Sequence, residues 1–213
     1  MALVDLVEGK VKDDSGKLNL LDDYLPAVEA ALADYSKHRP KIQVADLPGS
    51  DSHDLILPAE WVPDFSAVRT VEYPVDNIPA SQLSNDAWTL YRAPSGLQLR
   101  MLKDSVDTSE SVRLSFTIMR AEADVPAADQ DALACLAAAI CCDTLANIFT
   151  QSGDSTIAAD VVNYRSKGDE FARRGKQYRQ RFFDHFGIKE GSTQPAMSTV
   201  AAPKPTERTR ITH

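Results

Sequence analysis

Cysteine is scarce in this chain of 213 residues, which has three: Cys135, Cys141 and Cys142. All three lie in one helix-like stretch, and an odd number clustered in this way argues against a disulfide framework and for a reducing compartment. Neighbours on a helix point about 100° apart, so Cys141 and Cys142 are poorly placed to share a metal ion. We therefore expect small apolar core residues here.

Recognisable catalytic and cofactor motifs are also missing. The sequence contains no GxGxxG, no phosphate-binding glycine loop and no HExxH. Its four histidines are scattered, and none has metal-ligand spacing with a cysteine. We expect no catalytic residue, no cofactor and no metal site, and the protein is predicted not to be an enzyme. An enzyme with an unrecognised acidic site stays as a third, less favoured hypothesis.

The hydrophobic stretches of the sequence are shorter than a membrane-spanning helix. The N-terminus MALVDLVEGKVKDDSGK is charged throughout and does not resemble a signal peptide. The most apolar window, ALACLAAAICC, is about half the length needed to cross a bilayer. These features predict a protein that is made in the cytoplasm.

The charges that are present divide unevenly along the chain. Residues 1–160 hold 12 basic and 26 acidic side chains, whereas residues 161–213 hold 11 basic and 5 acidic ones. An acidic body therefore carries a basic helix and tail. This uneven charge distribution suits docking onto an acidic surface or stacking against copies of the same chain. It is equally consistent with a basic face that is simply exposed to solvent.

The longest element predicted is a helix over residues 156–186, about 45 Å long at 1.5 Å per residue. Asp154 or Ser155 can cap its start, and Gly187 can close its end with a positive φ. Apolar and small residues recur at spacings of three and four on one face. They are Val161, Tyr164, Gly168, Phe171, Gly175, Tyr178 and Phe182. The two glycines on this stripe should let another backbone approach closely.

The rest of the folded chain predicts an α+β class: a bundle of about three helices with an inserted small antiparallel β-sheet. Residues 1–18 read as an extended arm or a mobile end. A helix over 23–38 follows, with Pro26 in its first turn. Its apolar stripe is Leu21, Tyr24, Leu25, Val28, Ala31, Leu32 and Tyr35. Residues 41–120 alternate like four or five strands, with a hairpin turn at Pro94–Gly96. A helix over 126–151 should pair with 156–186 as an antiparallel hairpin.

The segment 188–213 has a different character from everything before it. It is rich in Thr, Ser, Pro and Ala, and it has no aromatic residue and no periodic apolar face. Nothing in it offsets the entropy of ordering the chain, so it cannot fold alone. The sequence therefore predicts an extended C-terminal tail that becomes ordered when it binds a partner.

Several stretches, taken in order, resemble the head–tail adaptor (connector or neck) proteins of tailed bacteriophages. They are LPAEW, FSAVRTVEYPV, SVRLSFTIMR and, most distinctively, SGDSTIAADVVNYRSK. The resemblance covers roughly residues 20–187 and implies a single adaptor domain over 1–187. It further implies a structural virion protein that forms a ring, commonly of twelve copies, beneath the portal. Such a ring extends the DNA channel and presents a surface to a tail or nozzle protein.

In that family the C-terminal segments typically insert into grooves of the portal, and the tail described above fits this role. We expect Lys204, Arg208 and Arg210 to meet acidic portal residues. The expected partners are copies of the same chain, the portal, and a tail or nozzle protein. The resemblance also implies that DNA passes through the channel without sequence-specific binding, and that the protein resides in the neck of a virion.

The alternative is a cytoplasmic nucleic-acid-binding or packaging accessory protein that uses the basic helix over 165–181. Seven Lys and Arg residues lie in that span. However, they spread around the helix and interleave with Asp169 and Glu170, whereas a phosphate-binding stripe would show fewer acids. Removal of residues 188–213 separates the two hypotheses, because it should abolish assembly but matter little for nucleic-acid binding.

Overall fold

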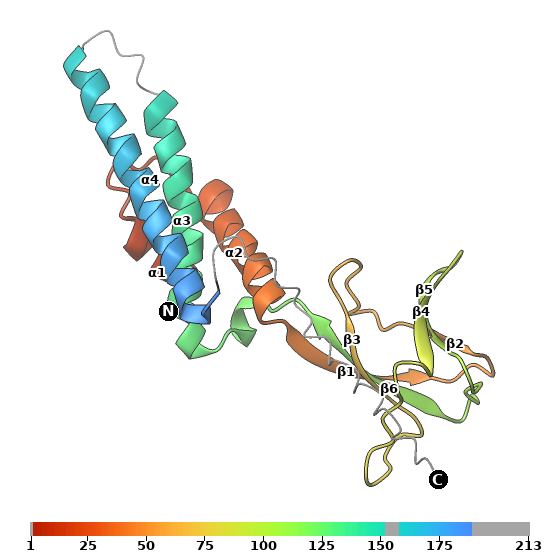
Figure 1. The fold of residues 1–213 in the computed structure, drawn as a ribbon. Helices are drawn as coiled ribbons and strands as arrows, with labels where there is room; N and C mark the ends of the chain where they lie inside the picture. Colours follow the sequence, from red (N-terminus) through yellow and green to blue (C-terminus); the bar gives the residue numbers. More distant parts are fainter. Residues whose placement is uncertain (1, 152–157, 189–213) are drawn as a thin grey trace, which may run out of the picture.

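The protein has an α+β fold, drawn in Figure 1 from a computed structural model that describes residues 2–151 and 158–188, with side chains left aside over 158–166. Four α-helices occur in these residues: α1 (Leu3–Val11), α2 (Leu25–His38), α3 (Ala127–Gln151) and α4 (Ala158–Phe186). A π-helical turn, η1 (Leu20–Tyr24), precedes α2, and a short 3-10 helix, η2 (Glu122–Asp124), precedes α3. The strands in the described residues are β1 (Lys41–Pro48), β2 (Asp54–Ile56), β3 (Val68–Glu72), β4 (Trp88–Ala93), β5 (Gly96–Met101) and β6 (Ser111–Ile118).

The strands form two antiparallel sheets of three strands each, in the orders β1–β6–β3 and β2–β5–β4. The prediction of one sheet with four or five strands is therefore wrong. The predicted hairpin is present between β4 and β5, where Gly96 has a φ of 128°. Both sheets contribute to one core, because Leu114 and Phe116 of β6 and Leu99 of β5 belong to the same buried cluster.

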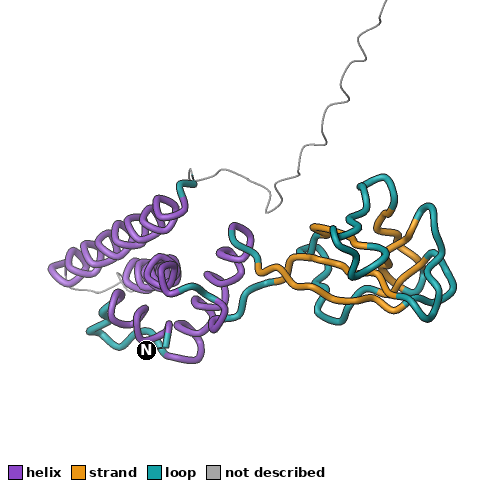
Figure 2. The backbone as a smooth tube through the Cα atoms, turned by 90° about the horizontal axis from the view of Figure 1, so that it is seen from below, coloured by secondary structure: helices purple, strands orange, loops and turns teal. Residues whose placement is uncertain are grey.

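The molecule is elongated, with the helices at one end and the sheets at the other (Figures 1 and 2). Two neighbouring strands connect the ends, since β1 follows α2 directly and β6 leads back toward α3. Arg120 holds this junction together by donating to the carbonyl oxygens of Arg39 (2.7 Å) and Asp124 (2.8 Å). The two ends are thus joined by a braced connection and not by a loose linker.

Helix α3 is the centre of the helical bundle and packs against α1, α2 and α4. Its side chains are mostly small, and the three cysteines are buried among them as expected. Burial raises the pKa of Cys141 to about 12 and that of Cys142 to about 11. By length and composition, α3 is the one helix of the described residues that could cross a membrane, but most of it is buried in the bundle.

The glycines on the α4 stripe allow the close approach that the sequence predicts. A Cβ added at Gly175 would lie 3.3 Å from the carbonyl oxygen of Ala139, and one at Gly168 would lie 3.3 Å from that of Ala146. Both carbonyls belong to α3, so the two helix backbones nearly touch at these points. Gly187 ends α4 with a φ of 64°, as predicted. The proposed caps Asp154 and Ser155 lie outside the described residues.

The N-terminal residues are not an extended arm, and this prediction is wrong. They form α1, whose buried side chains Leu3, Val7 and Val11 recur every fourth residue. The helix is held at both ends by the bundle: the backbone N–H of Leu3 donates to Glu122, and Arg174 donates to the carbonyl oxygen of Val11.

Helix α2 also differs from its prediction at the start. Pro26 lies in its first turn as expected, but the π-helical turn η1 comes before it. The π-turn shifts the helical phase, because its hydrogen bond from the Leu25 N–H to the Leu20 carbonyl spans five residues where an α-helical bond spans four. Leu21 and Leu25, expected on the buried stripe, are 72% and 38% exposed, whereas Tyr24 and Val28 are buried.

Candidate interaction surfaces

The tail residues Lys204, Arg208 and Arg210, predicted to bind a partner, lie outside the described residues. The structure describes the chain up to Ile188, so it defines the point from which the tail departs. That point is the C-terminal end of α4, close to the junction with the sheets (Figure 1). Contacts with α2 and α3 hold this end of α4.

A buried carboxylate fixes the end of α4 to two other helices. Asp129 of α3 is 2% exposed. One of its oxygens lies 2.9 Å from Nε2 of His185, and the other accepts hydrogen bonds from the Tyr35 hydroxyl (2.7 Å) and from Arg39 (2.9 Å). The carboxylate therefore links α2, α3 and the last turn of α4.

The electrostatics of this cluster favour an ionised Asp129. Burial alone would raise its pKa, but hydrogen bonds from His185 and Tyr35 and the charge of Arg39 outweigh burial, and the pKa is lowered. Tyr35 shows the complementary effect, since burial and its hydrogen bond to the carboxylate raise its pKa to about 12. A paired and hydrogen-bonded charge of this kind is costly to disrupt.

Aromatic rings surround the same helix end. Phe186 lies 5.7 Å from the Tyr35 ring between centroids, and the guanidinium of Arg39 lies 5.1 Å from the Phe186 ring. His38 packs edge-on against Phe182 at 6.2 Å. Polar and apolar contacts together fix the last turn of α4, from which the tail departs, to the rest of the bundle.

The exposed leucines form a second candidate surface, which we call the leucine patch: Leu20, Leu21 and Leu25. They are 47%, 72% and 38% exposed. Among the helical residues whose side chains the structure describes, which leaves out 158–166 of α4, they are the large hydrophobic side chains that are exposed. Leu21 and Leu25 are four residues apart, so their side chains neighbour one another. Apolar clusters of this kind on a surface mark contact sites more often than isolated exposed residues do.

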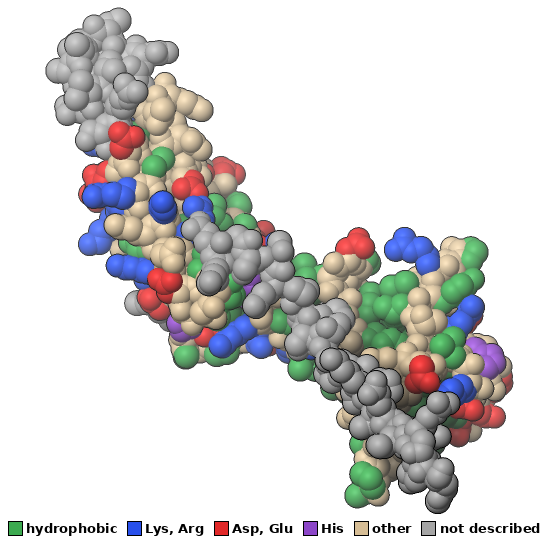
Figure 3. Space-filling view, in the orientation of Figure 1, with side chains coloured by type: hydrophobic (Ala, Val, Ile, Leu, Met, Phe, Trp, Pro, Cys, Tyr) green, Lys and Arg blue, Asp and Glu red, His purple; other side chains and the backbone are tan. Residues whose placement is uncertain are grey.

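Basic side chains along α4 fall into two groups. Arg174 and Arg179 point inward and are engaged, the first with carbonyl oxygens of α1 and the second with Asp143 at 2.5 Å. Arg173, Lys176 and Arg181 are exposed, and Figure 3 shows Lys and Arg over α4 with Asp and Glu side chains among them. The sequence places basic residues all around α4. The structure shows that some of these arginines bind neighbouring elements, whereas others face solvent.

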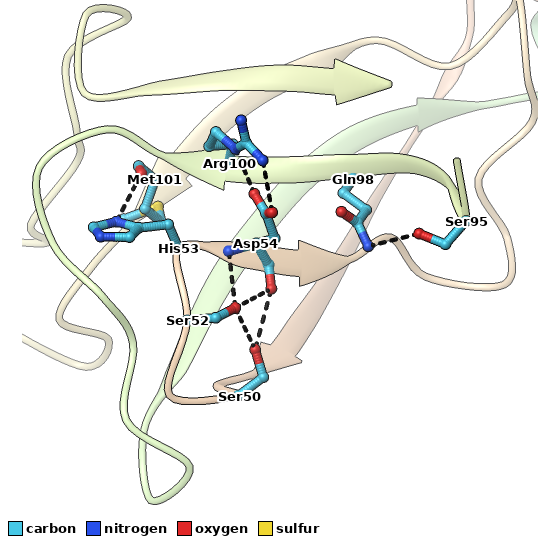
Figure 4. Close-up of polar contacts among 8 residues, drawn as sticks. All are labelled: Ser50, Ser52, His53, Asp54, Ser95, Gln98, Arg100 and Met101. Carbon is cyan, nitrogen blue, oxygen red and sulfur yellow. Dashed lines mark hydrogen bonds and ion pairs between the residues drawn. The ribbon is translucent and has the colours of Figure 1, made fainter. Parts of the chain in front are cut away.

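A groove of about 340 Å³ lies beside the edge of β2, lined by Ser50, Ser52, Asp54 and Gln98 among others. Figure 4 shows that the polar groups there bind one another: both serine hydroxyls donate to the carbonyl oxygen of Asp54, and its carboxylate takes two hydrogen bonds from Arg100.

The histidine nearest this groove is engaged elsewhere. Nδ1 of His53 contacts the carbonyl oxygen of Met101 at 3.1 Å and does not face the serine hydroxyls (Figure 4). A serine nucleophile needs a base within hydrogen-bond reach, and this arrangement supplies none. The contacts hold the loop 49–53 against β5. Over the described residues, no group of three or more His, Cys, Asp or Glu side chains has the geometry to hold a metal ion.

Comparison with known proteins gives structural neighbours but no family. No family model matches the chain, and no curated protein matches it significantly. One similar solved structure is described as the neck of a native GTA particle computed with C12 symmetry. It has 14% identity, covers 78% of this chain and 89% of its own, and gives a TM-score of 0.29.

Two further neighbours come from the same kind of particle. One is the virion of a native gene transfer agent, with 13% identity, coverage of 78% and 88%, and a TM-score of 0.30. The other is the neck of an empty GTA particle computed with C6 symmetry, with 14% identity, coverage of 79% and 88%, and a TM-score of 0.31. TM-scores this low carry no inference about function.

Proposed function

We propose that the chain is a structural virion protein that forms a ring joining the portal to the tail and extending the DNA channel. The observation that carries this proposal is the set of contacts that fix the end of α4 at His185 and Phe186. The segment that follows has a composition that predicts no independent folding. A partner that orders residues 188–213 would be coupled directly to the bundle. The sequence resembles phage head–tail adaptors, and this resemblance suggests that the partner is a portal.

The tail would bind through extended backbone and a few basic side chains. Lys204, Arg208 and Arg210 are the groups that would pair with acidic residues in a portal groove. A segment that orders only on binding loses part of its interaction energy to that ordering, so one tail alone would bind weakly. Many tails on one ring would bind together, because each bound tail raises the effective concentration of the next.

The elongated shape suits a protein that joins two different structures. The bundle carries the tail, while the sheets at the other end expose Ile56, Ile78 and Leu90. A tail or nozzle protein on the distal side would contact this second end. The proposal therefore assigns the two ends of the molecule to two separate partners.

A pull-down from cells that produce the particle tests this function. The bait is the full-length tagged chain or the same chain ending at Gly187, and mass spectrometry identifies what is recovered. We expect a portal-like ring protein with the full-length bait and its loss on truncation. A variant with Lys204, Arg208 and Arg210 changed to Glu should lose most of that recovery. The matched control changes Lys12, Arg92 and Lys103, which are exposed outside the tail, to Glu.

The same experiment addresses the nucleic-acid alternative. Recovery of nucleic acid alone, equal for both bait lengths and falling steeply with salt, would contradict the adaptor function. The exposed Arg173, Lys176 and Arg181 of α4 would then be the residues to change first.

A further inference from the structure

The leucine patch requires a covering surface. Leu21 and Leu25 belong to the apolar stripe of the sequence, yet η1 turns them away from the bundle core. Burying the apolar surface of a leucine side chain is favourable in proportion to the area removed from water. The exposed parts of Leu20, Leu21 and Leu25 therefore offer apolar area to whatever covers them.

Acidic groups surround this patch. Asp22 lies next to Leu21, and Glu29 is four residues beyond Leu25 on the same helix; both are exposed. Over residues 3–38, which include α1, η1 and α2, there are eight acidic and four basic side chains. A matching surface should combine apolar contact area with positive charge.

Helix α4 offers such a surface, which we call the basic stripe: Arg173, Lys176, Gln177, Gln180 and Arg181. All five are exposed, and their spacings of three and four place them on one face. On the same face, the exposed Asp169 and Glu170 lie one turn before the stripe and the exposed Asp184 lies one turn after it, so the positive charge is confined to residues 173–181. That face points away from Gly175, which packs on α3. The long aliphatic stems of Arg, Lys and Gln can cover leucine side chains while their polar heads reach an acidic rim.

The two surfaces cannot meet within one molecule. Figure 1 shows α4 and the start of α2 on opposite sides of α3. A contact between them must therefore join two copies, and it uses a different surface on each copy. Contacts of this heterologous kind repeat from copy to copy and close into a ring when the rotation allows.

We propose that the leucine patch of one copy packs against the basic stripe of the next copy around a ring. This inference rests on the proposed function, which requires a ring, and it names the surfaces that build it. The occupant of the leucine patch is thus a second copy of this chain, selected by charge and by the opposite placement of the two faces.

Cysteine cross-linking in particles tests the pairing. Leu21→Cys and Lys176→Cys are made separately in the full chain and then expressed together, and the particles are purified and oxidised. We expect a disulfide-linked dimer from the mixture and none from either variant alone, because a heterologous contact joins unlike surfaces. The buried Cys135, Cys141 and Cys142 serve as internal controls, since they should remain unlinked.

Each other outcome has a defined meaning. Dimers from Leu21→Cys alone would indicate a two-fold contact and overturn the pairing. Particles that contain the chain but give no mixed dimer would also overturn it, while the adaptor function would stand. A chain absent from particles would overturn the adaptor function and the inference together.

A competition experiment separates assembly from folding. Wild-type chain and Leu21→Glu are co-expressed, and mass spectrometry measures their ratio in particles. Because Leu21 is exposed, the variant should fold with an unchanged circular dichroism spectrum but be about tenfold depleted from particles. Lys176→Glu should also be depleted, and adding Glu29→Lys should restore part of its share. Lys12→Glu, an exposed control, should enter normally, and equal incorporation of Leu21→Glu would overturn the pairing.

Discussion

The helical bundle and the sheets achieve stability in different ways. Helix α3 of the bundle buries mainly alanine and cysteine, and Gly168 and Gly175 bring α4 against its backbone. The sheets instead bury a few large side chains, such as Leu114 and Phe116, between their two layers. Where two helix backbones are in close contact, there is little room for a larger side chain between them. In the sheet core, stability depends on each of the few large side chains.

The two cores are also separate. The bundle cluster and the sheet cluster share no residue, and the chain crosses between them through β1 and β6. Loss of one core should therefore leave much of the other intact. The rigid end that holds the tail belongs to the bundle, so damage to the sheets should not by itself release the tail.

The largest effect should come from the sheet core. Phe116 is fully buried and packs on the Trp61 ring at 5.7 Å, so Phe116→Ala should destabilise the sheets by about 3–5 kcal/mol. Hydrogen–deuterium exchange should then rise across β1, β3 and β6 while α3 stays protected. Leu133→Ala, in the bundle core, should produce the reverse pattern. Equal loss of protection at both ends in either variant would contradict the separation of the cores.

The second-largest effect should come from changing the buried carboxylate of Asp129. Asp129→Ala leaves the buried Tyr35 hydroxyl without its acceptor and frees Arg39 and His185, at a cost of about 1–3 kcal/mol. Urea denaturation of the bundle measures this change. Asp129→Asn keeps an acceptor for Tyr35 and should cost less, and an Ala variant as stable as wild type would contradict the anchoring role.

Acid should weaken the same contact. The folded-state pKa of Asp129 lies below its ordinary value, so its contribution is present above about pH 4, the unfolded pKa. The contribution is lost as pH falls through the folded pKa. We expect the wild-type bundle to lose stability more steeply than Asp129→Asn below pH 4. Matching pH profiles of the two proteins in urea titrations would show that Asp129 contributes nothing.

The smallest effects should have opposite signs at two glycines. Gly9 of α1 has open space where a Cβ would stand, so Gly9→Ala should stabilise by about 0.5–1 kcal/mol. At Gly175 the same Cβ would meet Asp143 at 2.8 Å and the Ala139 carbonyl at 3.3 Å. Gly175→Ala should therefore destabilise by about 1 kcal/mol despite its better helix propensity. Thermal denaturation measures both, and a stabilising Gly175→Ala would mean that the helices have room to separate.

Local chemistry made parts of this fold predictable. Pro26 and Gly187 have fixed backbone roles, and Gly168 and Gly175 lay on a regular stripe, so helix ends and the close approach could be inferred. The hairpin at Gly96 follows from the conformational freedom of glycine in a turn. Such features depend on neighbours in sequence and need no knowledge of the rest of the chain.

Features that depend on distant residues were missed. Helix α1 shows the spacing of Leu3, Val7 and Val11, but Gly9 and many charges obscured it, and α3 and α4 supply the contacts that stabilise it. The division into two sheets depends on which strands pair across long separations. Asp129 gave no local signal, because its partners Tyr35 and Arg39 are about 90 residues away. The exposure of Leu21 came from a π-turn that no pattern of residues announced.

The most direct test of the adaptor function is a cryo-electron microscopy reconstruction of the neck of the assembled particle. The account predicts a closed ring of this chain, with residues 188–213 of each copy ordered in a groove of the portal and Lys204, Arg208 and Arg210 facing acidic side chains. A neck that lacks this chain, or a ring whose tails touch no portal, would contradict it.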